Sequence, residues 1–317
     1  MIEMKNDFLS ILDLTRDELE EIFVLADALK HDNTYRPMLG QSAVLIFQKP
    51  SLRTRVSFEV GISQLGGHPT FLSHEAIGIG TREKTSDVAQ LLSRYVNLIV
   101  ARVFDHGMLQ EMAQYATIPV VNALSDLSHP CQVMADIYTI RQHNRLREGL
   151  KVVFVGDGNN VVNSWLELAA IYPIHVVLAC PKGFEPNAGI FKKAEQAGLS
   201  RIEIKEDPIS AVRGADVVYT DVWASMGQEA EAEARKKVFA PYQMNAKMMS
   251  EAGPQAMVMH CLPAHRGEEI TAEVLEGPQS IVFDEAENRL HIQKAILVKL
   301  TGNAVVVRTL EHRNHNL

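Results

Sequence analysis

The sequence predicts an α/β protein with two open parallel-sheet domains of similar size, each with helices on both faces of its sheet. Short apolar segments rich in strand formers alternate with segments of helical periodicity along most of the 317 residues. The polar stretch 142–149 interrupts this alternation once, after which it restarts. A chain of this length also typically forms about two domains of 100–200 residues each. We therefore expect domains at 1–145 and 146–289.

The composition is that of a globular protein and excludes several functional classes. Apolar residues make up 46% and charged residues 22%, close to ordinary usage. Lys plus Arg number 31 and Asp plus Glu 39, giving a net charge of −8, which lacks the basic footprint of a nucleic-acid-binding protein. No apolar run reaches the ~18 residues that a membrane span requires. A nucleic-acid or membrane partner is therefore not expected.

Localisation and redox state follow from the N-terminus and the cysteines. Residues 1–10 do not show the basic-then-apolar pattern of a secretory leader. Cys131, Cys180 and Cys261 are odd in number, far apart and without a CxxC pair, so neither a disulfide scaffold nor a structural zinc site is expected. We expect a cytoplasmic enzyme with no metal and no cofactor.

The first domain begins with helical periodicity over 7–30, broken near 13–15, where Thr15 and Glu18 have the spacing of a capping box. Strands are expected at 42–47, 68–72, 98–101 and 119–122, and helices at 53–65, 85–96, 108–116 and 130–143. These short connections between strands and helices predict a parallel sheet.

The second domain repeats the pattern. Strands are expected at 151–155, 175–179, 202–205, 217–220, 257–260 and 281–283, and helices at 161–171, 188–197 and, after Asp207-Pro208, up to Gly214. A final helical region, 286–307, is expected to return the chain from about 290 onward to the first domain. Such sheets bind ligands beyond the carboxyl ends of their strands, so we expect the active site in the cleft between the two domains.

Two loops of the first domain carry candidate site residues. The loop 48–55 contains Lys49, Arg53 and Arg55 at a helix N-terminus, where cations oppose the helix dipole, and this favours phosphate or carboxylate binding over a solvated basic turn. The loop 125–132 places His129 and Gln132 around a helix start, where they could donate to a carbonyl oxygen and accept from an amide. A plain capping turn with a buried cysteine is the alternative for that loop.

Three loops of the second domain remain. Residues 156–160 (GDGNN) resemble a dinucleotide motif but lack its third glycine, and Asp157 would oppose a pyrophosphate, so the amides suit a zwitterionic small molecule better. The loop after 217–220 offers the Asp221 carboxylate to an ammonium group, or is a structural turn. The loop after 257–260 holds two histidines and Cys261 without a zinc-finger spacing or a fourth ligand, and neither a metal nor a cysteine nucleophile is favoured.

Together these loops resemble a known family over essentially the whole chain. Residues 51–55 (SLRTR) look like the carbamoyl phosphate loop S-T-R-T-R, and 129–132 (HPCQ) look like H-P-x-Q. Residues 221–227 (DVWASMG) and 260–263 (HCLP) look like the D-x-x-x-S-M-G and H-C-L-P motifs of the ornithine branch. The chain thus resembles the ornithine carbamoyltransferases within the aspartate/ornithine carbamoyltransferase family.

The resemblance implies a reaction and a set of site residues. It implies transfer of the carbamoyl group from carbamoyl phosphate to the side-chain amine of L-ornithine, giving L-citrulline and phosphate in arginine metabolism. Carbamoyl phosphate would be bound by Ser51, Leu52, Arg53, Thr54, Arg102, His129, Gln132, Cys261, Leu262 and Arg289. Ornithine would be bound by Asn160, Asp221, Ser225 and Met226. Of these, Arg102, His129, Asp221 and Cys261 would be catalytic.

Two departures from the family pattern keep alternatives open. Leu52 replaces the threonine of many ornithine enzymes, and SLRTR also resembles enzymes that act on N-acylated ornithine. The loop 77–85 reaches a neighbouring subunit's site in this family, which implies a homotrimer, but Gly78 stands where relatives often carry Gln or His. No residue of this loop is assigned a role. A sister enzyme for putrescine or acylated ornithine, and a weakly active binding paralogue, are the alternatives.

Overall fold

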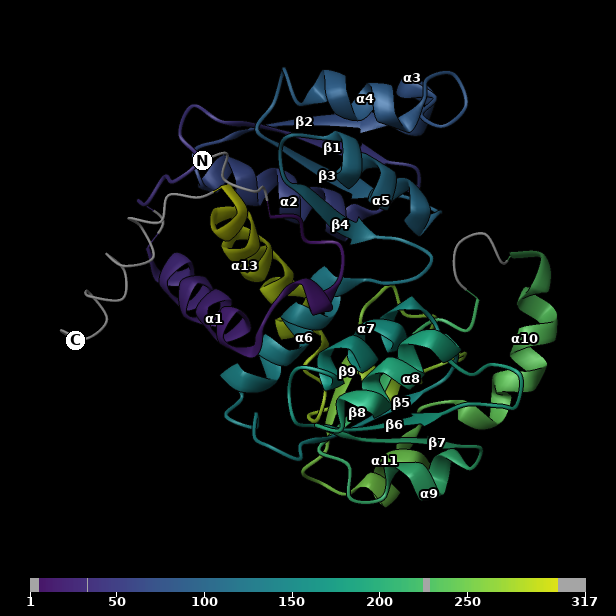
Figure 1. Cartoon of the computed structure of the whole chain (residues 1–317). Helices are drawn as coiled ribbons and strands as arrows, with labels where there is room; N and C mark the ends of the chain where they lie inside the picture. The colour runs from purple at the N-terminus through teal and green to yellow at the C-terminus, as the bar shows by residue number, and fades with distance from the viewer. Residues whose placement is uncertain (1–5, 33, 225–228, 302–317) are drawn as a thin grey trace. The chain divides into compact units, whose positions relative to one another are not determined.

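The computed structural model describes residues 6–32, 34–224 and 229–301 (Figure 1). Contacts divide the chain into two compact units, Met1–Met134 with Arg289–Leu317 (unit 1) and Ala135–Asn288 (unit 2). Helices α6 (Pro130–Gln142) and α13 (Val282–Thr301) each pass from one unit to the other. The unit boundaries therefore lie inside helices, whereas the sequence places the first boundary in the polar stretch that follows α6.

Unit 1 is built on a parallel sheet with strand order β2-β1-β3-β4. Its elements are η1 (Ile11–Asp13), α1 (Arg16–His31), β1 (Ser42–Phe47), α2 (Leu52–Gln64), β2 (His68–Ser73), α3 (His74–Ile77), α4 (Thr85–Leu92), β3 (Leu98–Arg102), α5 (His106–Tyr115) and β4 (Val120–Leu124). Strands β1 and β3 are almost entirely buried, as expected for a sheet covered on both faces.

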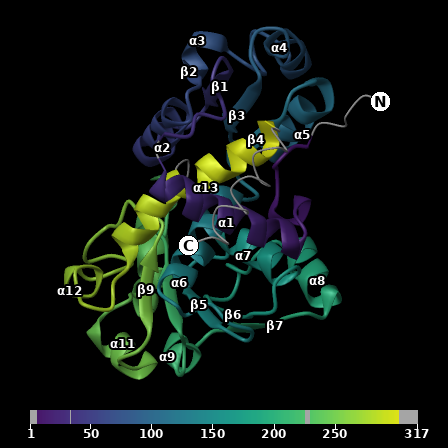
Figure 2. The same ribbon diagram turned by 90° about the vertical axis from the view of Figure 1, so that its left-hand side faces the viewer.

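Helix α1 begins as its sequence predicts. The Thr15 side chain accepts from the Glu18 N–H, and the Glu18 carboxylate accepts from the Thr15 N–H, which completes a capping box. The helix lies beside α13, as Figure 2 shows, with Lys299 2.9 Å from Glu21 and 3.5 Å from Glu18. Lys294 also donates to the Leu29 carbonyl at 3.0 Å. The end of the chain's last described helix is thus part of unit 1.

Unit 2 contains a parallel sheet with strand order β7-β6-β5-β8-β9. Its elements are β5 (Lys151–Val155), α7 (Asn160–Ala169), β6 (His175–Ala179), α8 (Ala188–Ala197), β7 (Arg201–Lys205), α9 (Pro208–Val212), β8 (Val217–Thr220), η2 (Glu229–Glu231), α10 (Ala232–Phe239), η3 (Ala240–Tyr242), α11 (Ala246–Ala252), β9 (Met257–His260) and α12 (Ala272–Leu275). The predicted fold class, two parallel-sheet domains with helices, is confirmed.

One expected strand is wrong. Residues 281–283 were expected to be extended, but α13 begins at Val282, and only Ser280 forms an isolated bridge, with Val258. The apolar run 281–283 is too short to distinguish a strand from the buried start of a helix. Asp284 and Glu285 in the first turn favour the helix, because carboxylates stabilise a helix N-terminus. Helix α4 also ends at Leu92, four residues before its expected end.

Candidate active site

In each sheet, the candidate residues follow neighbouring strands at the point where the strand order reverses. In unit 1, β1 lies between β2 and β3, and its last residue, Phe47, pairs with Arg102 at the end of β3. In unit 2, β5 lies between β6 and β8, and Val155 pairs with Thr220, the residue before Asp221. Ligands of open α/β sheets bind at such switch points.

The unit 1 cluster is centred on the buried Thr54 hydroxyl. Ser51 caps α2 by accepting from the Thr54 N–H at 3.3 Å. The Thr54 Oγ1 accepts from Arg102 Nη1 at 3.3 Å and from Arg289 Nη2 at 3.4 Å. Arg102 and Arg289 are themselves buried. Two guanidinium groups, from residues 48 and 235 positions after Thr54, therefore lie at the N-terminus of α2, a position suited to an anion.

His129 lies buried among the same cations, directly before α6. Burial lowers the pKa of His129 well below its ordinary value of 6.5, and the positive charges of Arg289, Arg102 and Arg53 lower it further. The imidazole is therefore neutral at physiological pH, and a neutral imidazole can donate one hydrogen bond. Gln132, one turn along α6, accepts from Arg289 Nη1 at 2.5 Å.

Three other residues of these loops point away from this cluster or are inert. Leu52 is 74% exposed. Arg55 is exposed, pairs with Glu59 at 3.1 Å and lies 3.7 Å over the Phe71 ring. Burial raises the pKa of the Cys131 thiol to about 12, and this thiol donates to the Asn122 carbonyl. Cys131 thus has the structural role that the sequence left open for it.

The unit 2 cluster is centred on the Asp221 carboxylate. Oδ1 accepts from the Cys261 thiol at 2.9 Å and from the Val222 N–H at 2.8 Å. Oδ2 accepts from Asn159 Nδ2 at 2.7 Å. Asp221 and Cys261 were both candidates, and the structure places them in contact. Asn159 was not a candidate, although it lies beside Asn160, because nothing in the sequence shows which of two adjacent amides faces a carboxylate.

The Cys261 thiol is protonated. Burial raises its pKa well above the ordinary value of 9.0, and the neighbouring Asp221 carboxylate raises it further. A cysteine nucleophile requires a depressed pKa, because the thiolate is the reactive form. The geometry therefore favours a hydrogen-bonding role for Cys261 over covalent chemistry.

The loop after β9 is held by hydrogen bonds to its own histidine. His260 Nδ1 accepts from the Leu262 N–H at 2.8 Å, so Nε2 carries the proton and donates to the Glu269 carboxylate at 3.0 Å. Leu262 has a φ of 54°, a conformation that non-glycine residues rarely adopt. The bond to His260 stabilises this backbone conformation directly after Cys261.

Two triads among the described residues have ligand atoms within 4.8 Å of one another, close enough for one metal ion. The first triad is Asp221, His260 and Cys261, whose polar atoms are engaged in the hydrogen bonds given above. In the second, His265 Nδ1 lies 3.9 Å from both Glu268 and Glu269. Lys236 also lies 2.9 Å from Glu268. Hydrogen bonds or ion pairs among these side chains and their neighbours therefore account for the closeness of the ligand atoms in both triads.

In the glycine-rich loop after β5, packing requires a glycine at position 158. A Cβ at Gly158 would lie 2.4 Å from the Pro186 nitrogen and 2.5 Å from the Glu185 carbonyl carbon. Asp157 pairs with the buried Arg235, which also donates to the Trp223 carbonyl. The loop is thus held against neighbouring backbone, and the carboxylate at its centre already has a cation.

Of the remaining candidates, Ser225 and Met226 lie outside the described residues, and Asn160 is the first residue of α7.

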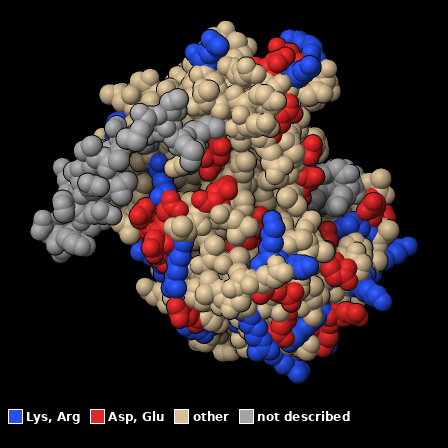
Figure 3. All heavy atoms as spheres, viewed as in Figure 1, with Lys and Arg blue, Asp and Glu red and all other residues tan. Residues whose placement is uncertain are grey.

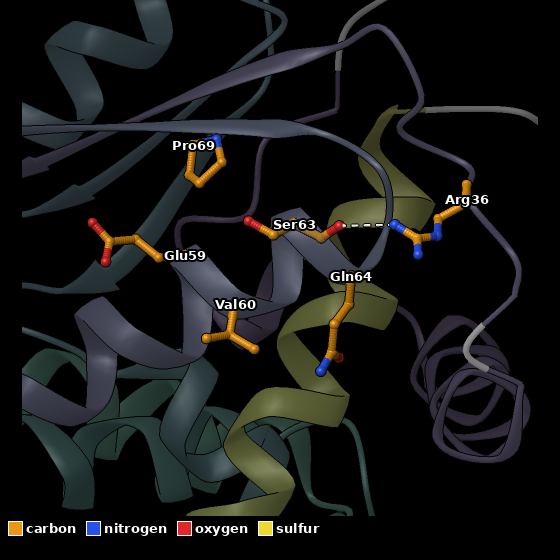
Figure 4. Close-up of a pocket in the computed structure, with 6 residues that line it drawn as sticks. All are labelled: Arg36, Glu59, Val60, Ser63, Gln64 and Pro69. Atoms are coloured by element: carbon orange, nitrogen blue, oxygen red, sulfur yellow. Dashed lines mark hydrogen bonds between the residues drawn. The ribbon is translucent and has the colours of Figure 1, made fainter.

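A hollow of about 580 Å³ opens on unit 1 beside α2 (Figure 4). It is lined by Arg36, Glu59, Val60, Ser63, Gln64 and Pro69, none of them a candidate residue.

On the face drawn in Figure 3, acidic and basic side chains are interspersed. No helix in the described ranges is long and apolar enough to cross a membrane.

Comparison with known proteins identifies both halves of the chain. Residues 6–142 match the carbamoyl-P binding domain of aspartate/ornithine carbamoyltransferase, and 148–300 match its Asp/Orn binding domain. An ornithine carbamoyltransferase of Chlorobaculum tepidum is 52% identical over 98% of this chain and 94% of its own.

Solved structures agree. An ornithine carbamoyltransferase from Pyrococcus furiosus has a TM-score of 0.90 and 47% identity, over 94% of this chain and 98% of its own. An N-acetyl-L-ornithine transcarbamylase variant has a TM-score of 0.84 and 31% identity, over 93% and 99%. The chain belongs to the aspartate/ornithine carbamoyltransferase family.

Proposed function

We propose that this protein is an ornithine carbamoyltransferase, which transfers the carbamoyl group from carbamoyl phosphate to the side-chain amine of L-ornithine. The observation that carries the proposal is the unit 1 cluster, in which arginines surround a buried hydroxyl and a neutral histidine. That arrangement suits a ligand with a dianionic phosphate and a neutral carbonyl. The ornithine carbamoyltransferases among its relatives, at about 50% identity, support the choice of acceptor.

In this proposal, unit 1 binds the donor. Ser51, the Leu52 main chain, Arg53, Thr54, Arg102 and Arg289 bind the phosphate at the start of α2. Neutral His129 donates to the carbamoyl oxygen, and Gln132 accepts from the carbamoyl amide. The bond from His129 becomes charge-assisted as negative charge develops on that oxygen, and it thereby stabilises the oxyanion during attack.

Unit 2 binds the acceptor. Asn160, Asp221, Ser225 and Met226 bind ornithine, and Cys261 and Leu262 lie beside the reacting amine. The side-chain ammonium has a pKa of about 10.4, as in lysine, so it loses a proton before attack. The Asp221 carboxylate attracts the ammonium. The Cys261 thiol donates a hydrogen bond to this carboxylate at 2.9 Å and restricts the orientation of the carboxylate.

The chemical step forms one bond and breaks one. The neutral amine attacks the carbamoyl carbon, forming the C–N bond of citrulline. The bond between the carbamoyl carbon and the oxygen that bridges it to phosphorus then breaks. Phosphate leaves with the electron pair of that bond, toward Arg53 and the N-terminus of α2. The second amine proton is lost to solvent or phosphate. No covalent enzyme intermediate is required.

The assembly and cellular setting belong to the same proposal. We infer a homotrimer in the cytoplasm that serves arginine metabolism. An exposed apolar stripe on α2, formed by Leu52, Val56 and Val60 at 74%, 46% and 39% exposure, supports association of copies through this helix. The loop 78–84 carries exposed Arg82 and Lys84 and is held compact by main-chain bonds to Gly78.

The proposed activity is tested by mixing the purified protein with carbamoyl phosphate and L-ornithine and measuring the ureido product and released phosphate. Citrulline and phosphate are expected in a 1:1 ratio, because one transfer releases one phosphate. A reaction mixture without the protein is the matched control for uncatalysed breakdown of the donor. Folded protein that releases no citrulline above this control would favour the binding-paralogue alternative.

A further inference from the structure

Two carboxyl groups are buried side by side in unit 2, near enough to Cys261 for their charge to act on its thiol. Asp136 lies on α6 and Glu285 on α13, and their exposed fractions are 0% and 1%. The two side chains hydrogen-bond to each other. Neither residue is a candidate site residue, and neither belongs to the motifs that identify the family in the sequence analysis.

Glu285 also accepts from two different strands of unit 2. Oε1 accepts from the Tyr219 hydroxyl of β8 at 3.0 Å, and Oε2 accepts from the His260 N–H of β9 at 3.0 Å. The Tyr219 ring is itself fixed between Phe154, with centroids 5.2 Å apart, and Trp165, at 6.2 Å. The Glu285 carboxyl thus joins α13 to the carboxyl ends of two adjacent strands.

A hydrogen bond between two carboxyl groups requires a proton, since two carboxylates offer only acceptors. The pair therefore holds one proton and one negative charge. Burial raises the pKa of Glu285, which favours retention of that proton. With the proton shared, both Glu285 oxygens remain available to Tyr219 and His260, whichever carboxyl carries it.

The hydrogen bond from the His260 N–H to Glu285 lies one residue before Cys261, which is proposed to lie beside the reacting amine. His260 is the last residue of β9, and Cys261 follows it, with its thiol 2.9 Å from Asp221 Oδ1. We propose that Asp136 and Glu285 are positioning residues, which share one proton, fix the main chain at His260, and so hold the Cys261 thiol against Asp221 for ornithine. The catalytic consequence rests on the proposed function, whereas the geometry of Cys261 does not.

Four substitutions separate this role from simple packing. D136N keeps a side chain that can hydrogen-bond to Glu285, and it leaves the bonds of Glu285 to Tyr219 and His260 intact. D136L is similar in size but removes the bond between the pair. E285Q is isosteric, but its NH₂ group cannot accept, so it either loses the bond from the His260 N–H or reverses the bond with the Tyr219 hydroxyl. D284N, at the exposed neighbour on α13, is the matched control.

Steady-state kinetics give the first readout. D136N and D284N are expected to keep kcat for ornithine within about 3-fold. D136L and E285Q are expected to lose about 10- to 100-fold in kcat, the scale of a small misplacement in a reacting group. The Kd for carbamoyl phosphate, measured by calorimetry, should stay within about 2-fold in all four, because the residues proposed to hold its phosphate lie in unit 1.

The second readout is independent of activity. Iodoacetamide labelling of Cys261, followed by mass spectrometry, should be faster in E285Q and D136L than in the wild type, and unchanged in D136N. If the wild type makes no citrulline, the proposed function fails, and labelling still tests the positioning. Thermal melts exclude unfolding, and should D136L not fold, the comparison of E285Q with D136N decides. Wild-type kcat and labelling in E285Q, or equal losses in D136N and D136L, would overturn the proposal.

Discussion

Arg289 on α13 donates a 2.5 Å hydrogen bond to Gln132 on α6, a residue 157 positions earlier in the chain. The same guanidinium group donates to the Thr54 hydroxyl at the start of α2. One side chain near the end of the chain therefore orients two candidate donor-site residues from separate loops of unit 1. The geometry of the proposed phosphate-binding residues therefore depends on the part of α13 that packs within unit 1.

Two arginines of the same loop are expected to differ sharply in importance. R53A should raise the KM for carbamoyl phosphate by about 10- to 100-fold, because a hydrogen bond to a charged group contributes about 1.5–3 kcal/mol. R55A should change this KM by less than about 3-fold, since Arg55 is exposed and engaged with Glu59 and Phe71. Initial rates at saturating ornithine measure both. Equal losses in the two variants would contradict the donor site described above.

Removing the Cys261 thiol is expected to slow the acceptor half of the reaction. C261A should lower kcat/KM for ornithine by about 10-fold, as expected for a lost neighbour of the nucleophile, and leave the Kd for carbamoyl phosphate within about 3-fold. C180A provides the matched control, because Cys180 is a buried thiol of unit 2 outside the candidate site. Unchanged turnover and unchanged ornithine affinity in C261A would refute the role given to this thiol.

The buried His129 predicts a pH dependence of stability. Its pKa lies below the ordinary 6.5 in the folded protein, so as pH falls below 6.5 the unfolded chain binds a proton that the folded chain does not. The contribution of neutral His129 to the free energy of unfolding is thus fully present above pH 6.5 and decreases as pH falls toward the folded pKa. Urea titrations at pH 7.5 and 5.5 should show a larger decrease for the wild type than for H129N. An equal decrease in both proteins would mean that His129 is not held neutral.

The exposed stripe on α2 predicts where copies associate. V56D places a charge in the centre of the stripe and should shift the protein from trimer to monomer in sedimentation velocity at micromolar concentration. V24D, at a similarly exposed valine on α1, is the control and should leave the assembly unchanged. A V56D protein that remains trimeric would place the interface elsewhere.

Much of the fold could be predicted from periodicity, because buried parallel strands and amphipathic helices have distinct patterns. The capping box at Thr15 and the short helix after Asp207 begin at the residues expected. The strand expected at 281–283 was wrong because three apolar residues fit either a strand or a helix start. Helices α3, α10, α11 and α12 were not predicted, since their short segments lack a clear apolar stripe.

The site was predictable in its residue types but not in its contacts. Parallel-strand order brings Arg102 to the loop after β1, a consequence that strand assignments alone do not give. That Asn159 bonds Asp221 depends on the geometry of the α7 N-terminus. The bond between Asp136 and Glu285 joins residues 149 positions apart, and no local pattern indicates it.

Ornithine is proposed as the acceptor, and a comparison of four amines as acceptors tests this choice. The purified protein would be given carbamoyl phosphate with ornithine, putrescine, N-acetylornithine or aspartate, and the ureido product measured by mass spectrometry. We expect a product from ornithine, with kcat/KM at least about 100-fold above the other three, since two or more lost polar contacts cost about this much. A product mainly from N-acetylornithine or putrescine would leave the donor half standing and contradict the roles given to Asp221 and Cys261.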